Sequence, residues 1–308
     1  MSSQEAAAGA GGAAGALLAY SDELAQLIER VGQSVVRVDA RRRQSGSGVL
    51  WAGGLVVTAD HVLERDEDVS VGLADGRTVP ATVAGRDPGT DLALLRVEGA
   101  GGPAIARAAA PRTGQLALVV ARPGRLAATM GLVSAVGGPI RTWRGGRLEG
   151  VIWTDAALYP GFSGAPLVDA SGGMLGVVTT QFGRGAGLAI PLATVERIMA
   201  ALQAHGRIRR GFLGIHSQVV AIPDGLRTRL GLAQDTGLLV VGVERGGPAE
   251  RGGVLIGDVL IALDQQPIRS TDDLVGVLGP ERVGQETPLR VIRGGEIREV
   301  RVTIGERA

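Results

Sequence analysis

The chain has 308 residues, of which 45% are hydrophobic and 20% charged, and its formal net charge is +1 at pH 7. This length is enough for two domains with their own cores, and the near-neutral charge gives no electrostatic basis for binding nucleic acid or an acidic membrane. Cysteine and lysine are both absent, which excludes thiol nucleophiles, disulfides, cysteine metal sites, Schiff-base chemistry and a serine–lysine dyad.

The N-terminal segment is rich in alanine and glycine, and we expect residues 1–15 to form a flexible tail. It has neither the basic start nor the strongly apolar core of a secretory signal. No stretch of the chain reaches the roughly 18 apolar residues of a membrane span. These features favour a cytoplasmic location and predict no membrane span. A short helix is predicted from Leu17 to Val31, with Ser21 as its N-cap.

The next part of the chain is a series of short apolar runs separated by turn signals, which predicts a mostly β domain. The runs are 34–39, 47–52, 55–58, 69–73, 79–84, 92–97, 115–121, 128–136, 150–154, 166–169, 174–180 and 186–190. This number of strands fits two six-stranded antiparallel barrels. The basic cluster from Arg41 to Arg43 lies between the first two runs and is expected in a solvated hairpin loop. A helix from Ala193 to Gln203, capped by Thr194 and ended by Gly206, is predicted to close the domain.

From Arg209 onward the pattern changes to a smaller α+β domain. Strands are predicted at 211–217, 237–244, 258–264, 287–293 and 297–304, with two short helices near 247–252 and 271–279.

Three residues far apart in the sequence indicate nucleophilic catalysis. His61 ends one apolar run, Asp91 opens another, and Ser163 lies between Gly161 and Gly164 just before a third. Each alone has an ordinary structural explanation, namely a strand-end histidine, a strand-start turn residue and a Gly-Ser turn. The order His-Asp-Ser is that of the chymotrypsin arrangement. In it Ser163 attacks a carbonyl, His61 takes its proton and Asp91 orients the imidazole.

Other acyl-transfer and metal chemistries fit less well. An α/β-hydrolase elbow needs glycine where Ala165 stands and a helix after the serine, whereas a hairpin is predicted here. The other two histidines, His205 and His216, are too scattered for a metal site, and we expect both on the surface. No cofactor and no metal are expected.

Several motifs resemble those of the HtrA/Deg serine endopeptidases. They are TADHV at 58–62, TDLAL at 90–94, TDAA at 154–157, GFSGAPL at 161–167, GLAIP at 187–191 and RGFLGI at 210–215. Phe162 stands where this family usually has asparagine, and Ala165 where it usually has glycine. The resemblance implies a chymotrypsin-like double barrel over residues 16–208 and a PDZ domain over residues 209–308.

The resemblance also suggests binding residues. The oxyanion hole is expected at the N–H groups of Gly161 and Ser163, with the N–H of Phe162 left open as a third donor. The resemblance implies a primary pocket walled by Leu158, Leu188, Ala189 and Ile190. Asp155 lies two residues too far from Ser163 to be an acidic pocket base, so a small or medium aliphatic P1 residue is expected.

In the PDZ domain, the resemblance implies that a backbone nest captures the carboxylate of a C-terminal peptide. The residues of this groove would be Phe212, Leu213, Gly214, Ile215, Leu274 and Leu278. The alternative is that these glycines and leucines are ordinary turn and core residues.

The implied substrates are unfolded or damaged proteins, and the implied PDZ partners are the C-termini of substrates or effectors. The resemblance also leaves export open as an alternative to the cytoplasmic location. A homotrimer stays open, with Tyr20 as the main aromatic candidate for its contact. Two other functions stay open as well: a proteolytically silent PDZ-bearing binding protein, and an esterase acting on small acyl substrates.

Overall fold

The computed structural model describes residues 3–41, 44–142, 147–182, 187–208 and 211–306. The chain divides into two compact units, Met1–Ile208 and Arg209–Ala308.

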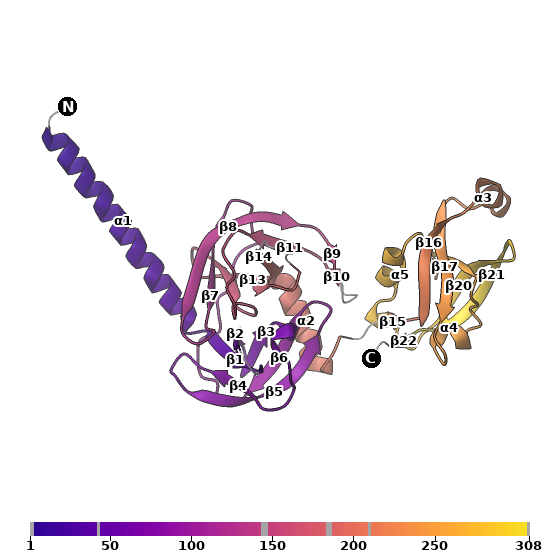
Figure 1. Ribbon diagram of the computed structural model, residues 1–308, viewed down its shortest axis with the longest axis horizontal. Coiled ribbons are helices and arrows are strands. Elements are labelled where there is room, and N and C mark those ends of the chain that lie inside the picture. Colours follow the sequence, from indigo (N-terminus) through magenta and orange to yellow (C-terminus); the bar gives the residue numbers. More distant parts are fainter. Residues whose placement is uncertain (1–2, 42–43, 143–146, 183–186, 209–210, 307–308) are drawn as a thin grey trace. The chain divides into compact units, whose positions relative to one another are not determined.

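The first unit contains two closed six-stranded antiparallel barrels, which confirms the predicted architecture (Figure 1). The first barrel has the order β1-β2-β3-β6-β5-β4 and the second the order β11-β14-β13-β12-β7-β8. The first consists of β1 (Val35–Asp39), β2 (Gly46–Trp51), β3 (Leu55–Thr58), β4 (Val69–Gly72), β5 (Thr78–Asp87) and β6 (Leu92–Val97). The second consists of β7 (Leu116–Ala121), β8 (Ala127–Gly137), β11 (Val151–Thr154), β12 (Pro166–Asp169), β13 (Met174–Thr179) and β14 (Gly187–Pro191). A further ribbon, β9 (Ile140–Arg141) with β10 (Arg147–Leu148), was not predicted because two residues show no alternation.

Alternation along the strands builds separate cores. Val56 and Leu95 point into the first barrel, and Ile152 and Val178 into the second. The neighbouring side chains on these strands, such as Val57, belong to a third core between the barrels and helix α2. Because strands of both barrels are covered on two faces, many of their runs are continuously apolar rather than alternating.

The N-terminal helix corrects the sequence prediction. Helix α1 (Ser3–Gly32) begins at Ser3 rather than Leu17, so the segment expected to be a flexible tail is helical, and Ser21 lies inside the helix instead of capping it. Leu27 and Val31 are buried against strand β7 and provide the packing that a helix needs. Alanine has the highest helix propensity, so the preceding alanine-rich segment continues the helix. Among the described helices, none combines the length and apolar character required to cross a membrane.

Helix α2 (Leu192–His205) covers the third core. Its buried side chains recur at the predicted spacing, and Gly206 ends it in the left-handed conformation with φ 70°. Thr194 is buried inside the helix and is not its cap; Pro191 precedes the helix without a side-chain hydrogen bond. His205 ends the helix with an exposed side chain.

The second unit has one five-stranded antiparallel path, in the order β16-β17-β18-β20-β21. These are β16 (Ile215–Ala221), β17 (Thr236–Val243), β18 (Val259–Leu263), β20 (Glu286–Arg293) and β21 (Glu296–Thr303), with β19 (Gln266–Pro267) beside β18 and a small ribbon of β15 (Gly211–Phe212) and β22 (Gly305–Glu306). The predicted helices correspond to α4 (Pro248–Arg251) and α5 (Thr271–Val277). Helix α3 (Asp224–Leu230) was missed, because it is only seven residues long and its apolar face consists of two half-buried residues, Leu226 and Leu230.

Candidate active site

His61 and Asp91 lie side by side in the first barrel. A 3-10 turn, Asp60–Val62, follows β3 and carries His61, while Asp91 occupies the turn before β6. His61 Nδ1 lies 2.8 Å from Asp91 Oδ2, and the His61 backbone N–H donates to Asp91 Oδ1 at 2.9 Å. Since a carboxylate only accepts, Nδ1 carries the proton and Nε2 is left as the base.

Asp91 is held in an unusual backbone conformation. Its φ is +58°, which is uncommon for a residue other than glycine. Its carbonyl accepts from the Asp60 N–H at 3.1 Å, and its side chain is only 2% exposed. Thr179, the last residue of β13, donates its hydroxyl to Asp91 Oδ2. The second barrel therefore supplies a partner that fixes the carboxylate of the first.

The turn that carries Ser163 requires its glycines. Gly161 and Gly164 have φ values of +86° and +88°. A Cβ at Gly164 would lie 2.1 Å from the carbonyl oxygen of Ser47, so only glycine fits. Ser47 fixes the turn from β2, because its hydroxyl donates to the Gly161 carbonyl at 2.8 Å and its N–H to the Ser163 carbonyl at 3.1 Å.

Two backbone N–H donors remain available beside Ser163. The N–H of Phe162 donates to the Tyr159 carbonyl at 3.0 Å, so it is not a third oxyanion donor. Within the described part of the chain, the N–H groups of Gly161 and Ser163 have no hydrogen-bond acceptor. These are the two groups that the sequence suggested for an oxyanion hole.

The side chains of Ser163 and His61 are not hydrogen-bonded to each other in the described part of the structure. The Ser163 Oγ instead lies 3.1 Å from the hydroxyl of Thr180. Ser163 and His61 nevertheless line the same hollow, which has a volume of about 280 Å³. The structure thus brings all three predicted residues to one site, with the His–Asp contact formed and the Ser–His contact open.

Arg41 forms part of the same hollow. It is a quarter exposed and donates to the carbonyl of His61. Arg41 is therefore only partly solvated in the loop that was expected to be solvated, while Arg42 and Arg43 lie outside the described residues.

A buried ion pair supports the histidine turn. Asp60 is 1% exposed and lies 2.7 Å from Arg86 Nε. Burial by itself would lower the pKa of Arg86, but its hydrogen bonds and charge interactions with Asp60 and Asp66 outweigh this and raise the pKa. The guanidinium therefore stays charged and holds the residue next to His61.

Of the four predicted pocket residues, one lines the hollow and three do not. Leu158 is half-buried and lines the hollow beside Ser163. Leu188, Ala189 and Ile190 are fully buried and are absent from its lining. They lie on β14, where Leu188 and Ala189 pair with both β11 and β13 and leave no free edge for a substrate. Asp155 accepts from the Leu132 N–H at 2.6 Å and so fixes β8.

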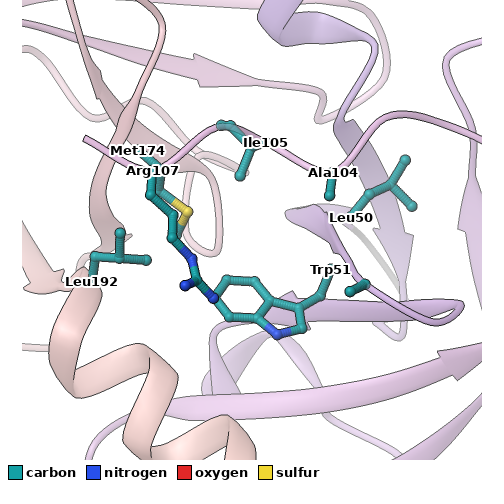
Figure 2. Close-up of a pocket in the computed structure, with 8 residues that line it drawn as sticks. Leu50, Trp51, Ala104, Ile105, Arg107, Met174 and Leu192 are labelled. Carbon is teal, nitrogen blue, oxygen red and sulfur yellow. The ribbon is translucent and has the colours of Figure 1, made fainter.

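A second hollow lies at the opposite end of β2 (Figure 2). It has a volume of about 80 Å³, and its lining is apolar apart from Arg107, which pairs with Glu196 at 2.8 Å. The lining residues are Leu50, Trp51, Ala52, Ala104, Ile105, Arg107, Met174 and Leu192. It shares no residue with the first hollow and contains no candidate nucleophile or base.

The described residues contain no cluster of three potential metal ligands.

In the second unit, the predicted groove residues lie near one edge of the sheet. Leu213 and Gly214 use their carbonyls to accept from Ala249 and Glu244, each at 2.8 Å, while their own N–H groups have no acceptor in the described part of the chain. Gly214 has φ +75°. This turn therefore presents two free donors in succession, as an anion-binding nest requires.

The apolar members of the groove share a core. Ile215, Leu274 and Leu278 pack against the same buried cluster. Strand β16 is at the edge of the five-stranded path, so one side of it is open to a further strand. Phe212 is half-buried in β15, and His216 is exposed as expected.

Comparison with known proteins agrees with this geometry. Residues 46–177 match the trypsin-like peptidase domain family, and residues 211–304 match the PDZ domain family. The first unit thus has the fold of a trypsin-like peptidase domain and the second that of a PDZ domain.

Solved structures narrow the class further. The chain is similar to the HtrA-type protease AlgW with a decapeptide, with 30% identity, a TM-score of 0.75, and coverage of 92% of this chain and 98% of that one. It is also similar to a serine endoprotease from Yersinia pestis, with 28% identity, a TM-score of 0.75, and coverage of 92% and 97%. The chain belongs to the HtrA family of serine proteases.

Curated relatives give the same family. A probable periplasmic serine endoprotease DegP-like of Ectopseudomonas mendocina is 34% identical over 276 residues, which cover 86% of this chain and 57% of the relative. A protein of the same name from Halomonas elongata is 32% identical over 275 residues, with the same coverages. The chain therefore spans a little over half the length of these relatives. Their names place them in the periplasm and give no support to the expected cytoplasmic location.

Proposed function

We propose that this protein is a serine endopeptidase in which His61, Asp91 and Ser163 form the catalytic triad. The observation that carries the proposal is the 2.8 Å contact between His61 Nδ1 and Asp91 Oδ2 beside a serine in the same hollow. The fold and the family support this chemistry, because HtrA relatives are named serine endoproteases.

The mechanism follows from the available donors and acceptors. Ser163 turns from Thr180 toward His61, whose Nε2 takes the hydroxyl proton as Oγ attacks the peptide carbonyl. The N–H groups of Gly161 and Ser163 stabilise the oxyanion. Asp91 stabilises the imidazolium, which then gives its proton to the leaving amine. Water hydrolyses the acyl-enzyme by the same steps in reverse.

The substrates proposed are unfolded or damaged proteins. Only an extended segment lets a scissile carbonyl approach Ser163, which is 6% exposed. DegP-like relatives are named periplasmic, so we also propose that the protein acts in quality control outside the cytoplasm. Fractionation of cells producing an epitope-tagged chain tests the location.

The PDZ unit is proposed to bind the C-termini of substrates or effectors. The support is the pair of free N–H groups at Leu213 and Gly214 beside the open edge of β16. Charge-assisted hydrogen bonds to a carboxylate are strong, so the full-length Ser163→Ala chain should bind peptides with a free apolar C-terminus and reject their amides. Equal binding of acid and amide in calorimetry would remove the carboxylate nest.

A homotrimer is proposed to cover an apolar surface on α1 and β8. Leu17 and Leu18 are 69% and 66% exposed, and Tyr20 contacts the half-exposed Met130 through a 3.5 Å bond from its hydroxyl to the sulfur. Light scattering should give three times the chain mass, and Leu18→Glu should lower it. A monomeric wild type would remove this proposal without affecting the triad.

The direct test of the endopeptidase is Ser163→Ala. This variant should lose casein degradation, keep its circular dichroism spectrum, and lose labelling by a fluorophosphonate. Wild-type turnover of nitrophenyl esters without casein degradation would favour the esterase. Absence of both activities and of label would favour the silent binding protein, an alternative suggested by the Ser163–Thr180 contact.

A further inference from the structure

An exposed aromatic side chain stands on the rim of the active-site hollow. Tyr159 is 58% exposed and lies four residues before Ser163, and both line the hollow that contains His61. None of the catalytic steps uses Tyr159, so its exposed ring calls for another explanation.

The ring of Tyr159 is held in place by the core of the second barrel. It contacts Phe162 edge-to-face, with ring centroids 5.7 Å apart and an interplanar angle of 86°. Phe162 is 3% exposed and belongs to the buried cluster that fills this barrel. The Tyr159 carbonyl accepts from the Phe162 N–H at 3.0 Å, and Pro160 restricts the backbone between them. The exposed ring is therefore preorganised, and a ligand that packs on it does not have to order it.

The surroundings of the ring favour an apolar ligand group. Leu158 and Pro160 flank Tyr159 on its own segment, and Val62 lines the hollow next to His61. Arg41 also reaches this hollow, but it already donates to the carbonyl of His61. A bulky apolar side chain near the scissile bond would bury area against Tyr159, whereas an alanine would not reach it.

We propose that Tyr159 is a specificity-determining residue that selects an aromatic or large aliphatic substrate side chain within two positions of the scissile bond. If that position is P1, the proposal replaces the small or medium aliphatic residue expected from the sequence. This proposal rests on the proposed endopeptidase function. Aromatic pairs contribute stabilisation beyond their buried area, which corresponds to about a 2- to 10-fold preference in kcat/KM.

The experiment maps cleavage sites. Wild type, Tyr159→Ala and Tyr159→Phe are incubated with a peptide library from a digested proteome, with Ser163→Ala as the background, and the new ends are identified by mass spectrometry. Wild type should enrich Phe, Tyr or Leu at one position within two residues of the cut. Tyr159→Phe should keep this enrichment and Tyr159→Ala should lose it.

Kinetics separate recognition from a structural role. With a matched pair of peptides that carry Phe or Ala at the enriched position, Tyr159→Ala should lower the ratio of kcat/KM values about 2- to 10-fold. An unchanged cleavage profile, or an equal loss on both peptides, overturns the role of Tyr159 while leaving the endopeptidase in place. Failure of the wild type to cleave any peptide or to react with a fluorophosphonate overturns the proposed function itself.

Discussion

The hydrogen bond between Ser163 and Thr180 predicts that a single substitution should increase the reaction rate of Ser163, the proposed nucleophile. In the structure the Ser163 hydroxyl is 3.1 Å from Thr180 Oγ1 instead of bonding to His61. In the proposed mechanism, this contact has to break before Ser163 can bond to His61. Valine has nearly the shape of threonine but no hydroxyl, so Thr180→Val removes the competing partner at an exposed position where the fold should tolerate it.

The magnitude follows from the strength of such a bond. A neutral hydrogen bond contributes about 0.5–1.5 kcal/mol net. Because about 1.4 kcal/mol is tenfold in rate, Thr180→Val should raise fluorophosphonate labelling and kcat/KM by about 2- to 12-fold. Thr180→Ser retains the hydroxyl and should behave like wild type. Equal or slower labelling of the Val variant beside a normal Ser variant would show that Thr180 does not restrain Ser163.

Three further predictions concern the supports of the site and of the PDZ unit. In urea unfolding, Gly164→Ala should destabilise the chain by about 1–3 kcal/mol more than Gly53→Ala. Both glycines have positive φ, but only a Cβ at position 164 would clash with the backbone. Equal losses of stability would contradict this reasoning. Thr179→Val should lower kcat/KM by on the order of tenfold with little change in KM, since Asp91 loses a charge-assisted bond, and Thr179→Ser should retain activity. Burial would raise the pKa of Asp258, but hydrogen bonds from Arg293 and the Leu255 N–H outweigh it and lower the pKa. The stability that this ionised carboxylate provides is therefore full above the unfolded-state pKa of about 4 and is lost as the pH falls below that value. In circular dichroism melts, Asp258→Asn should flatten this acid dependence. Glu286→Gln, in an exposed ion pair, should leave it unchanged.

The sequence predicts the two barrels because strands depend on local patterns. Apolar runs with turn signals mark the strands, and the two glycines around Ser163 mark a turn with positive φ. His61 and Asp91 could be paired only because their order matched a known arrangement.

The residues that hold the proposed triad in place were not predicted. Ser47 and Thr179 are ordinary strand residues in the sequence, and their role arises only when strands of two barrels come together. The signal available was weak: both are hydroxyl residues in otherwise apolar buried strands, where a polar group needs a partner.

The sequence also could not show how Leu188, Ala189 and Ile190, the expected pocket wall on β14, are placed in the barrel. An apolar run such as Leu188–Ile190 indicates a strand but not which of its edges are paired. In the closed barrel, Leu188 and Ala189 pair with both β11 and β13, and Ile190 pairs with β13. The start of α1 was missed because alanine-rich sequence has strong helix propensity but no amphipathic period.

The distribution of tryptophan makes the two units distinguishable in the intact chain. The three tryptophans are at positions 51, 143 and 153, and residues 209–308 contain none. Trp51 lies in the hollow where strands of both barrels and the start of α2 meet (Figure 2). Tryptophan emission during denaturation therefore reports on the peptidase unit alone, while far-ultraviolet circular dichroism adds the signals of both. A difference between the midpoints of these two transitions would measure how independently the PDZ unit unfolds, without any added label.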